Sequence, residues 1–297
     1  FRRCQHLFQV RLTMRCMHFM LGLCGSLVLH SAFANCTDAQ SMPNNGRGKF
    51  IVPSAMGGGC YEGEVSNGKF SGFGKHILAN GDIAVGQFKN SMLNGAGEVF
   101  GTRTLQRGQF LDGKLHGFGI SRLDKLDPNT KKIYEVEYYE GAWVNGVRHG
   151  LGYLNIGGVT YEGDFEKGLT IGYGELFSPL VGRYVGTVRS IKFNGSPMSE
   201  KHGQGIFYDL NGNSYEGIWR GHSIKTGTAK YANGDIYKGE FTNALINGRP
   251  TIVPHGRGEM KKADGSELIA IFKEGKMSSL LRLTAPVPQS KPAVPGK

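Results

Sequence analysis

The chain lacks cysteine after residue 60, and it also lacks a long hydrophobic run, a dense basic cluster and a recognisable catalytic constellation. All five cysteines fall within the first 60 residues, so the remainder offers no Cys/His spacing of a known zinc site. The formal net charge is +11, but no nucleic-acid module or basic stripe accompanies it, which argues against a nucleic-acid partner. No nucleophile lies near a base in any known pattern, so we expect no enzymatic activity.

Residues 14–34 have the composition of a secretory signal peptide. A basic start at Met14-Arg15 is followed by an apolar run from Phe19 to Leu29 and by the small-residue site Ala32-Phe33-Ala34. The apolar run is shorter than the ~20 residues that a transmembrane helix needs. We therefore expect export, to the periplasm or the cell exterior, with cleavage after Ala34, and an uncleaved anchor as the alternative. Residues 1–13 precede the first methionine, and we expect them to lie outside the functional protein.

Cleavage after Ala34 would leave two cysteines, Cys36 and Cys60. A cysteine pair in an exported chain predicts a disulfide, and the alternative is two free thiols without a role. A disulfide here would close a loop of roughly 25 residues and add about 3 to 4 kcal/mol of stability on the loop-entropy model. We expect it to pin the Pro-, Asn- and Gly-rich leader, residues 35–59, over the first repeat unit as a cap.

A repeat occupies most of the chain, in the form Tyr-x-Gly-x-(Phe/Trp/Val) followed by a Gly-x-Gly turn. A fixed period of this kind indicates a repeat architecture, which offers an extended surface rather than one enclosed pocket. Most of the motif glycines are spaced by 22 or 23 residues, and three spacings are longer by about one loop. The motif glycines are Gly63, Gly86, Gly108, Gly141, Gly163, Gly186, Gly217 and Gly239, with Ala270 at the next position.

Each repeat unit predicts a β-hairpin. Residues 161–165 alternate large apolar and polar side chains, which is the pattern of a strand. Residues 166–168 then turn the chain, and residues 172–177 begin the return strand. The 47 glycines in 297 residues far exceed the usual share of about 7%. We expect an all-β chain in which the repeated aromatic residues of neighbouring hairpins stack, since one hairpin alone cannot bury a core.

The repeat resembles that of the MORN (membrane occupation and recognition nexus) family, Tyr-x-Gly-x-(Phe/Trp)-x-x-Gly-x-x-x-Gly-x-Gly. Residues 139–152 match it nearly throughout, and the resemblance covers about residues 60–276. It implies an elongated single-layer antiparallel sheet of about nine hairpins, with roles in scaffolding, dimerisation or phospholipid binding. The residues expected to build the repeat are Tyr61, Gly63, Tyr139, Gly141, Trp143, Tyr161, Gly163, Phe165, Tyr184, Gly186, Tyr215, Gly217, Trp219, Tyr237, Gly239 and Phe241.

Two repeats contain an insertion before the Gly-x-Gly turn, and these insertions are the candidate binding sites. The distance from motif glycine to turn glycine is 9 residues in the first five repeats and 17 in the sixth and eighth. Both inserted loops follow the pattern apolar-Asn-Gly-x-Pro and should project from one edge of the array, two repeats apart. Insertions on one face of a repeat array often bind partners; the alternative is a tolerated surface insertion. The candidate residues are Phe193, Asn194, Met198, Ile246, Asn247 and Arg249.

Four repeats carry a histidine before the turn: His116, His149, His202 and His255. We expect a role in the turn, because no recognised metal-ligand spacing accompanies these residues. No cofactor or metal is expected. Residues 277–297 are rich in proline at their end and predict a flexible tail.

The sequence therefore predicts an exported, non-catalytic repeat protein that acts as a scaffold or protein-interaction module. The expected partner is another protein or a second copy of the chain. Without residues 1–34 the net charge is about +7, which suits solubility and also suits an anionic partner. The alternative function is thus peripheral binding of anionic phospholipid or of an envelope polymer.

Overall fold

The structure is a computed structural model that describes residues 36, 38–193 and 196–284. The predicted signal peptide lies outside the described residues. The chain divides into two units, of which the second begins at Ala39 and contains every described strand. The described residues form 20 strands, one short 3-10 turn (Ser54–Met56) and no α-helix. The all-β prediction is confirmed. No helix among these residues is long and apolar enough to cross a membrane.

The strands follow one another closely along the chain. Their bounds are β1 (Gln40–Ser41), β2 (Gly46–Ile51), β3 (Cys60–Ser66), β4 (Lys69–Ile77), β5 (Ile83–Lys89), β6 (Met92–Phe100), β7 (Thr104–Leu111), β8 (Lys114–Leu126), β9 (Ile133–Val144), β10 (Val147–Ile156), β11 (Val159–Glu166), β12 (Leu169–Ser178), β13 (Gly182–Phe193), β14 (Ser196–Asp209), β15 (Ser214–Arg220), β16 (Ser223–Lys230), β17 (Ile236–Ile246), β18 (Arg249–Lys261), β19 (Glu267–Lys273) and β20 (Lys276–Thr284).

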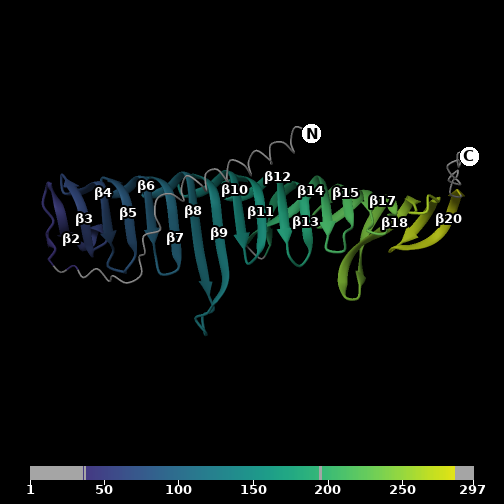
Figure 1. The fold of residues 1–297 in the computed structure, drawn as a ribbon, viewed down its shortest axis with the longest axis horizontal. Helices are drawn as coiled ribbons and strands as arrows, with labels where there is room; N and C mark the ends of the chain where they lie inside the picture. Colours follow the sequence, from purple (N-terminus) through teal and green to yellow (C-terminus); the bar gives the residue numbers. More distant parts are fainter. Residues whose placement is uncertain (1–35, 37, 194–195, 285–297) are drawn as a thin grey trace, which may run out of the picture. The chain divides into compact units, whose positions relative to one another are not determined.

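Every strand from β2 to β19 pairs with the next strand in the chain, and all these pairings are antiparallel. The two-residue β1 adds a parallel pairing to β2. The strands from β3 to β20 make nine consecutive hairpins in one open sheet (Figure 1). We call the edge formed by the turns within these hairpins the hairpin edge. The opposite edge, formed by the connections from one hairpin to the next, is the connection edge.

In five of the repeats a core tyrosine explains the paired glycines. In the fifth repeat the Tyr161 ring lies over Gly163 and Gly174, which face each other across β11 and β12. A Cβ atom at Gly163 would lie 2.4 Å from the Tyr161 hydroxyl oxygen, and one at Gly174 would lie 2.6 Å from a ring carbon. The hydroxyl group is 3.1 Å from the Asp164 carbonyl and 2.9 Å from that of Ile171. The buried hydroxyl thus has acceptors, and side chains at the two glycines would displace the ring.

Aromatic contacts join each repeat to the next. The Tyr139 ring meets Trp143 of its own repeat at 4.9 Å and Phe165 of the following repeat at 5.1 Å, edge to face in both cases. Tyr237 repeats the pattern with Phe241 at 5.1 Å and Phe272 at 5.3 Å. Each such contact contributes about 0.5 to 1.5 kcal/mol beyond simple burial. The core is therefore a continuous aromatic row along one face of the sheet.

The hairpin edge is held by backbone hydrogen bonds from several of the turns to the preceding repeat. The turn glycines Gly113, Gly146 and Gly168 donate their N–H groups to the carbonyl oxygens of Leu93, Leu115 and Arg148, at 2.8, 2.8 and 2.9 Å. Each turn therefore lies against its neighbour rather than projecting free.

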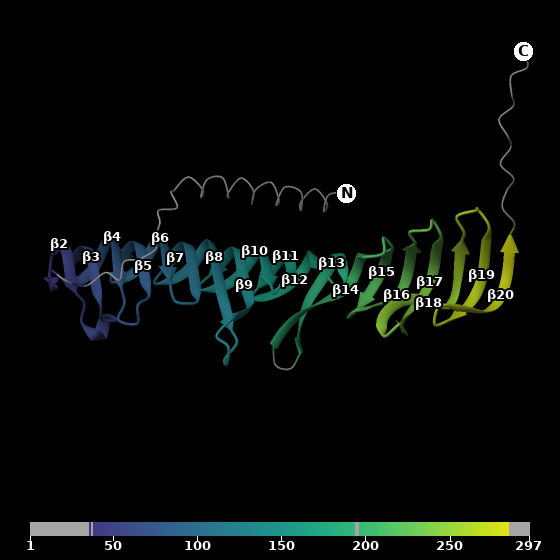
Figure 2. The ribbon, with the colours of Figure 1, turned by 60° about the horizontal axis from the view of Figure 1, so that its bottom comes forward.

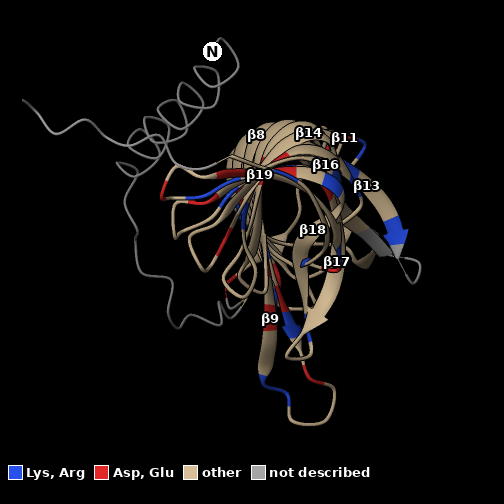
Figure 3. Cartoon of the chain, turned by 90° about the vertical axis from the view of Figure 1, so that its right-hand side faces the viewer, with Lys and Arg blue, Asp and Glu red and all other residues tan. Residues whose placement is uncertain are grey.

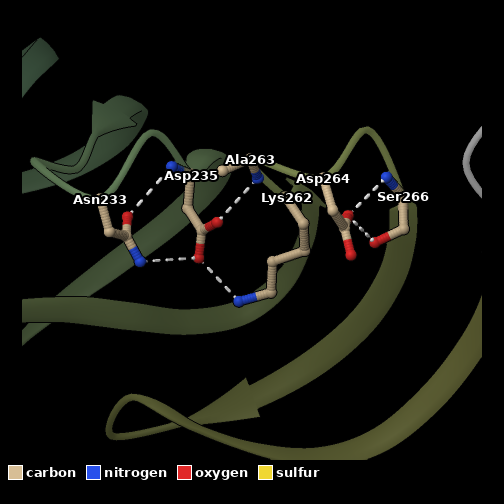
Figure 4. Close-up of polar contacts among 6 residues, drawn as sticks. All are labelled: Asn233, Asp235, Lys262, Ala263, Asp264 and Ser266. Carbon is tan, nitrogen blue, oxygen red and sulfur yellow. Dashed lines mark hydrogen bonds and ion pairs between the residues drawn. The ribbon is translucent and has the colours of Figure 1, made fainter. Parts of the chain in front are cut away.

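The connection edge is held by the side chains of Asn and Asp residues. Asn213 accepts the Ala232 N–H at 2.9 Å, and one repeat later Asp235 accepts the Ala263 N–H at 3.0 Å. Asp235 also receives hydrogen bonds from Lys262 at 2.7 Å and from Asn233 at 3.2 Å (Figure 4). These contacts hold the pKa of the Asp235 carboxyl below its usual value, with the Lys262 hydrogen bond as the main cause.

Strands extend the array at both ends. The leader expected over residues 35–59 contributes β1 and β2, because residues 46–51 pair with the outer side of β3. Glu274 and Gly275 adopt φ values of 50° and 83° and reverse the chain into β20, which runs to Thr284 and includes the first described residues of the expected tail, 277–284. Cys36 and Cys60 are disulfide-bonded to each other, in agreement with the predicted pair.

Candidate interaction surfaces

The two predicted insertions are paired strand extensions rather than irregular loops. We call residues 189–200, at the end of β13–β14, the first arm, and residues 242–251, at the end of β17–β18, the second arm. Pairing continues to the pair Ile246–Arg249 in the second arm and to Phe193–Ser196 in the first. Both arms end at the hairpin edge, because each contains the turn of its own hairpin. Figure 1 shows the second arm and Figure 2 the first arm extending past the neighbouring hairpins.

Polar contacts hold the base of each arm against the preceding repeat. Ser190 and Ser199 of the first arm both lie within 2.9 Å of the Thr170 hydroxyl. Asn243 of the second arm donates to the Ser223 hydroxyl at 2.9 Å. These contacts replace the turn hydrogen bond of an ordinary repeat. The chain beyond them therefore extends away from the sheet as a two-stranded ribbon.

The second arm exposes aliphatic side chains. Leu245 is 75% exposed and Ile246 is 46% exposed. Asn247 and Gly248 form the tip with φ values of 50° and 73°, as in the type I′ turns of tight hairpins. Arg249 is also exposed. This tip contains three of the six residues predicted to bind, and their binding role stays a prediction.

The first arm holds the other three predicted residues. Phe193 is the last residue of β13, and Asn194 lies outside the described residues. Met198 pairs with Ile191 and is partly buried. On the arm, Arg189 and Glu200 form an ion pair at 2.5 Å, in which the Glu200 side chain is 8% exposed.

A third extension lies at the connection edge, where the paired ends of β8 and β9 continue past the neighbouring strands. The sequence analysis did not propose it as a site. Its residues Ile133 and Tyr134 are 53% and 66% exposed. They line a hollow of about 430 Å³ together with Tyr138 and the turn glycines Gly157 and Gly158. The lengthening of the third repeat after its Gly-x-Gly turn was the sequence signal that marked this extension.

The last strand, β20, is exposed along its whole length. Met277, Leu280, Leu281 and Leu283 are each about half exposed or more, at 53, 48, 51 and 63%. Only β19 pairs with β20 among the described strands. The other edge strand, β1, has two residues. The C-terminal edge of the described sheet therefore offers unpaired backbone groups and apolar side chains together.

Two of the four histidines support turns, which is the role expected of them. His116 Nδ1 accepts the N–H of Asn145 at 3.5 Å, and His255 Nδ1 accepts the N–H of Glu274 at 3.4 Å. Each acceptor thus lies against the turn of the following hairpin. Over the part of the chain that the structure describes, no three His, Cys, Asp or Glu side chains are grouped as metal ligands.

Two cations occupy core positions, which the sequence analysis missed. In the first six repeats the residue two places before the Gly-x-Gly turn packs beside the aromatic row, and we call these positions the core column. They are Phe70, Leu93, Leu115, Arg148, Thr170 and Lys201. The guanidinium of Arg148 lies 5.0 Å above the Tyr139 ring. The ammonium of Lys201 lies 3.7 Å from the centre of the Phe207 ring and 4.8 Å from that of Trp219, with Tyr184 at 5.7 Å.

Burial perturbs the groups around Lys201. Loss of contact with water lowers the pKa of the Lys201 ammonium to about 8. His222, in the turn after β15, also has a lowered pKa, first because it is partly removed from water and then because Lys201 is positive. The same cause acts in the opposite direction on the core tyrosines, since burial raises the pKa of Tyr237 to about 12. Counting two residues back from each Gly-x-Gly turn would have located Lys201 in the sequence.

Comparison with protein families finds the MORN repeat in four segments of the chain. The matched residues are 61–83, 107–123, 139–154 and 253–267. The first three coincide with the hairpins β3–β4, β7–β8 and β9–β10, and the fourth with β18 and the turn after it. The prediction of MORN repeats is confirmed for these segments.

Among curated proteins, the chain is similar to alsin. It is 30% identical to rat, mouse and human alsin over 137 residues, which make up 45% of this chain. The match spans only 8% of the length of alsin.

Among solved structures, the chain matches the wild-type TCP10 domain of Danio rerio CPAP in complex with a peptide of Danio rerio STIL. The TM-score is 0.35 at 13% sequence identity, over 80% of this chain and 97% of the other.

Proposed function

We propose that the array is an exported, non-catalytic scaffold that binds protein partners through its arms. The observation that carries the proposal is the exposure of Leu245 and Ile246 on a ribbon held away from the sheet. A two-stranded ribbon is only marginally stable alone, and exposed aliphatic clusters mark interaction sites. A partner that covers the second arm would bury these side chains and order the tip.

The distribution of charge favours a protein partner over an anionic membrane. Oppositely charged pairs recur along the sheet, such as Arg107–Glu98 at 2.7 Å, Arg183–Glu175 at 3.2 Å and Lys261–Glu267 at 3.3 Å. Figure 3 shows basic and acidic residues interspersed on the strands. A membrane surface is attracted by clustered basic residues, whereas these charges neutralise one another locally.

Self-association is a second candidate, and β20 favours it. A second copy could pair its own β20 antiparallel to the exposed edge, with Leu280 opposite its counterpart. In that register Lys276 faces Thr284 and Arg282 faces Ser278, so no like charges lie opposite each other, which such a pairing needs. The exposed leucines would then be covered across the new strand pair.

Export is supported by the signal-peptide pattern in residues 14–34 and by the Cys36–Cys60 disulfide. Disulfides persist in oxidising compartments and are rare in the cytosol. Expression of the full chain followed by fractionation and mass spectrometry tests this part: we expect a processed chain that begins near residue 35 outside the cytoplasm. A chain retained in the cytoplasm with reduced thiols would contradict it.

The arm is tested by comparing Leu245→Ser/Ile246→Ser with the matched control Leu180→Ser/Val181→Ser. The control removes a similar exposed pair, at 86 and 55%, from the connection edge. After crosslinking in the native compartment, we expect the arm variant to lose a partner species that the control retains. Equal crosslinking by both variants would contradict the role of the arm.

The same proteins are then mixed with phosphatidylglycerol vesicles at low and physiological salt. Binding that fades with salt and is unchanged by the arm substitutions would favour the anionic-lipid alternative. Light scattering of the chain and of Leu280→Lys tests self-association: we expect a dimer that becomes a monomer. A monomer before substitution would exclude the β20 dimer at the concentration used.

A further inference from the structure

Lys201 is an exception in the core of the array. Its position belongs to Phe70, Leu93 and Leu115 in the first three repeats, which are 1, 4 and 2% exposed. In the sixth repeat the same position carries an ammonium group surrounded by the rings of Tyr184, Phe207 and Trp219. Lys201 is partly exposed, so its ammonium loses part of its hydration, and the rings offset about 0.5 to 2 kcal/mol of that cost. An apolar side chain would lose no hydration of this kind here.

The fourth repeat shows how the array satisfies such a cation. Arg148 occupies the same column position over the Tyr139 ring, and it forms an ion pair with Glu137, two residues before that tyrosine. The equivalent residue in the sixth repeat is Gly182, two residues before Tyr184. Nothing replaces the missing carboxylate, because no hydrogen bond or ion pair reaches the Lys201 ammonium from the residues that the structure describes. Of the two cations in the core column, Arg148 thus has an acidic partner and Lys201 has none among the residues that the structure describes.

The charged neighbours of Lys201 do not fill this role. Glu200 lies on the opposite face of β14 and forms its ion pair with Arg189. His222 lies in the turn after β15 and carries no negative charge; loss of contact with water and then the positive charge of Lys201 lower its pKa. Tyr184 is the titratable group among the three rings near the ammonium, and burial raises its pKa. The site therefore holds a partly exposed ammonium group without an acidic partner, close to three buried rings.

We propose that Lys201 is the anchor of a carboxylate-binding site on the aromatic face, which takes an acidic side chain of a protein partner. This inference rests on the proposed scaffold function and names the chemistry of its partner. A carboxylate carries one negative charge, which a single ammonium neutralises. A phosphate dianion carries a second negative charge that a single ammonium leaves unneutralised, and it is bound by several donors.

The site makes binding depend on pH in a defined direction. Because the pKa of free Lys201 is about 8, about nine-tenths of the ammonium is charged at pH 7 and about one-tenth at pH 9. A bound carboxylate favours the charged form and raises the pKa of Lys201 toward its ordinary value. Binding is therefore expected to be about tenfold weaker at pH 9 than at pH 7, with proton uptake at pH 8.

The test uses the full chain and a hexaglutamate peptide as the probe. The ¹³Cε resonance of Lys201, assigned from its absence in Lys201→Met, reports its pKa directly. We expect a saturable shift of this resonance with peptide, a rise in its pKa, and loss of the tenfold pH effect in Lys201→Met. Arg148→Met removes the same charge from the same column in the fourth repeat, and we expect it to keep the effect.

Several results would overturn the inference. Equal affinity of Lys201→Met and Arg148→Met for the peptide would show that the peptide senses only net charge. An unchanged pKa of Lys201 at saturation would place the peptide elsewhere. Stronger Lys201-dependent binding of inorganic phosphate or of phosphatidylglycerol vesicles would assign the site to phosphate. A separate Lys201→Gln variant keeps the polarity and size of the side chain, so a loss of binding there is not a consequence of unfolding. The arm variants remain an independent test of the scaffold function, since they leave Lys201 intact.

Discussion

Replacing Gly174 by alanine tests whether the tyrosine ring sets the glycine pattern of the repeat. The new Cβ would lie 2.6 Å from a Tyr161 ring carbon and 2.7 Å from the Glu162 carbonyl oxygen. Backbone strain plays no part, because Gly174 is not among the residues with positive φ. Relief requires the buried ring to move, which overpacks the core and separates the Tyr161 hydroxyl from its two carbonyl acceptors.

The expected cost is about 3 to 5 kcal/mol, from roughly 1 to 3 for overpacking and about 1 to 2 for the displaced hydrogen bonds. Gly158→Ala is the control. Its Cβ would meet nothing within 4 Å, although its φ of +89° costs an alanine some strain, about 1 to 2 kcal/mol. Because unfolding of a repeat array need not be two-state, amide hydrogen exchange of β11 and β12 is the measurement.

A double-mutant cycle separates the ring from other causes. In Tyr161→Ala/Gly174→Ala the clash with the ring is removed and only the approach to the Glu162 carbonyl oxygen remains, so we expect the glycine substitution to cost at least about 1 kcal/mol less than it does in the natural chain. The reasoning is refuted if Gly174→Ala costs no more than Gly158→Ala, or if the two substitutions are additive.

Three further changes have expected outcomes. Lys201→Met should raise stability below pH 8. Because the folded pKa of about 8 lies below the unfolded value, the natural chain is expected to gain stability between about pH 8 and 10.5, and the substitution should remove that gain. Urea midpoints at pH 7 and 10 measure this, and equal curves would contradict it. Asp235→Ala should cost about 1 to 3 kcal/mol near pH 7. Since the carboxyl pKa of Asp235 is lowered from 3.8, the ionic part of this loss should begin to shrink below that value and disappear as pH falls through the lower folded pKa. Denaturation of both proteins at pH 7 and at a series of pH values below 4 checks it, and a constant difference would count against the ion pair. Cys60→Ser should remove about 2 to 4 kcal/mol of stability and lower the melting temperature to that of the reduced natural chain. Calorimetry with and without a reductant gives the comparison. No difference between the oxidised and the reduced natural chain would show that the disulfide adds no stability.

The sequence predicted the hairpin array well because its signals are local. Tyr161, Gly163 and Gly174 occupy fixed offsets that recur in several repeats, and the same ring-on-glycine packing follows in each of them. The type I′ tip at Asn247-Gly248 is likewise encoded by two adjacent residues. Features of this kind need no knowledge of distant contacts.

The features missed depend on contacts between repeats. Residues 189–200 read as a loop because their alternation is weak, and their strand pairing follows from Ser190 and Ser199 meeting Thr170 of the preceding repeat. The sequence predicts a tail over residues 277–297, and strand β20 covers the start of that segment. Its leucines are exposed, so burial left no periodic signal in the sequence. Lys201 was missed because the column to which it belongs is formed by six repeats together.

The consecutive pairing of strands has a mechanical consequence. Each strand bonds only to its neighbours in the chain, and both edges link a repeat only to the adjacent one. A force that pulls the two ends of the row apart would load one strand pair at a time, so the hydrogen bonds would open in succession, as in a zipper. A force along the strands would instead load all bonds of a hairpin at once. The array is therefore suited to hold bound molecules at fixed spacing, and poorly suited to transmit tension from end to end.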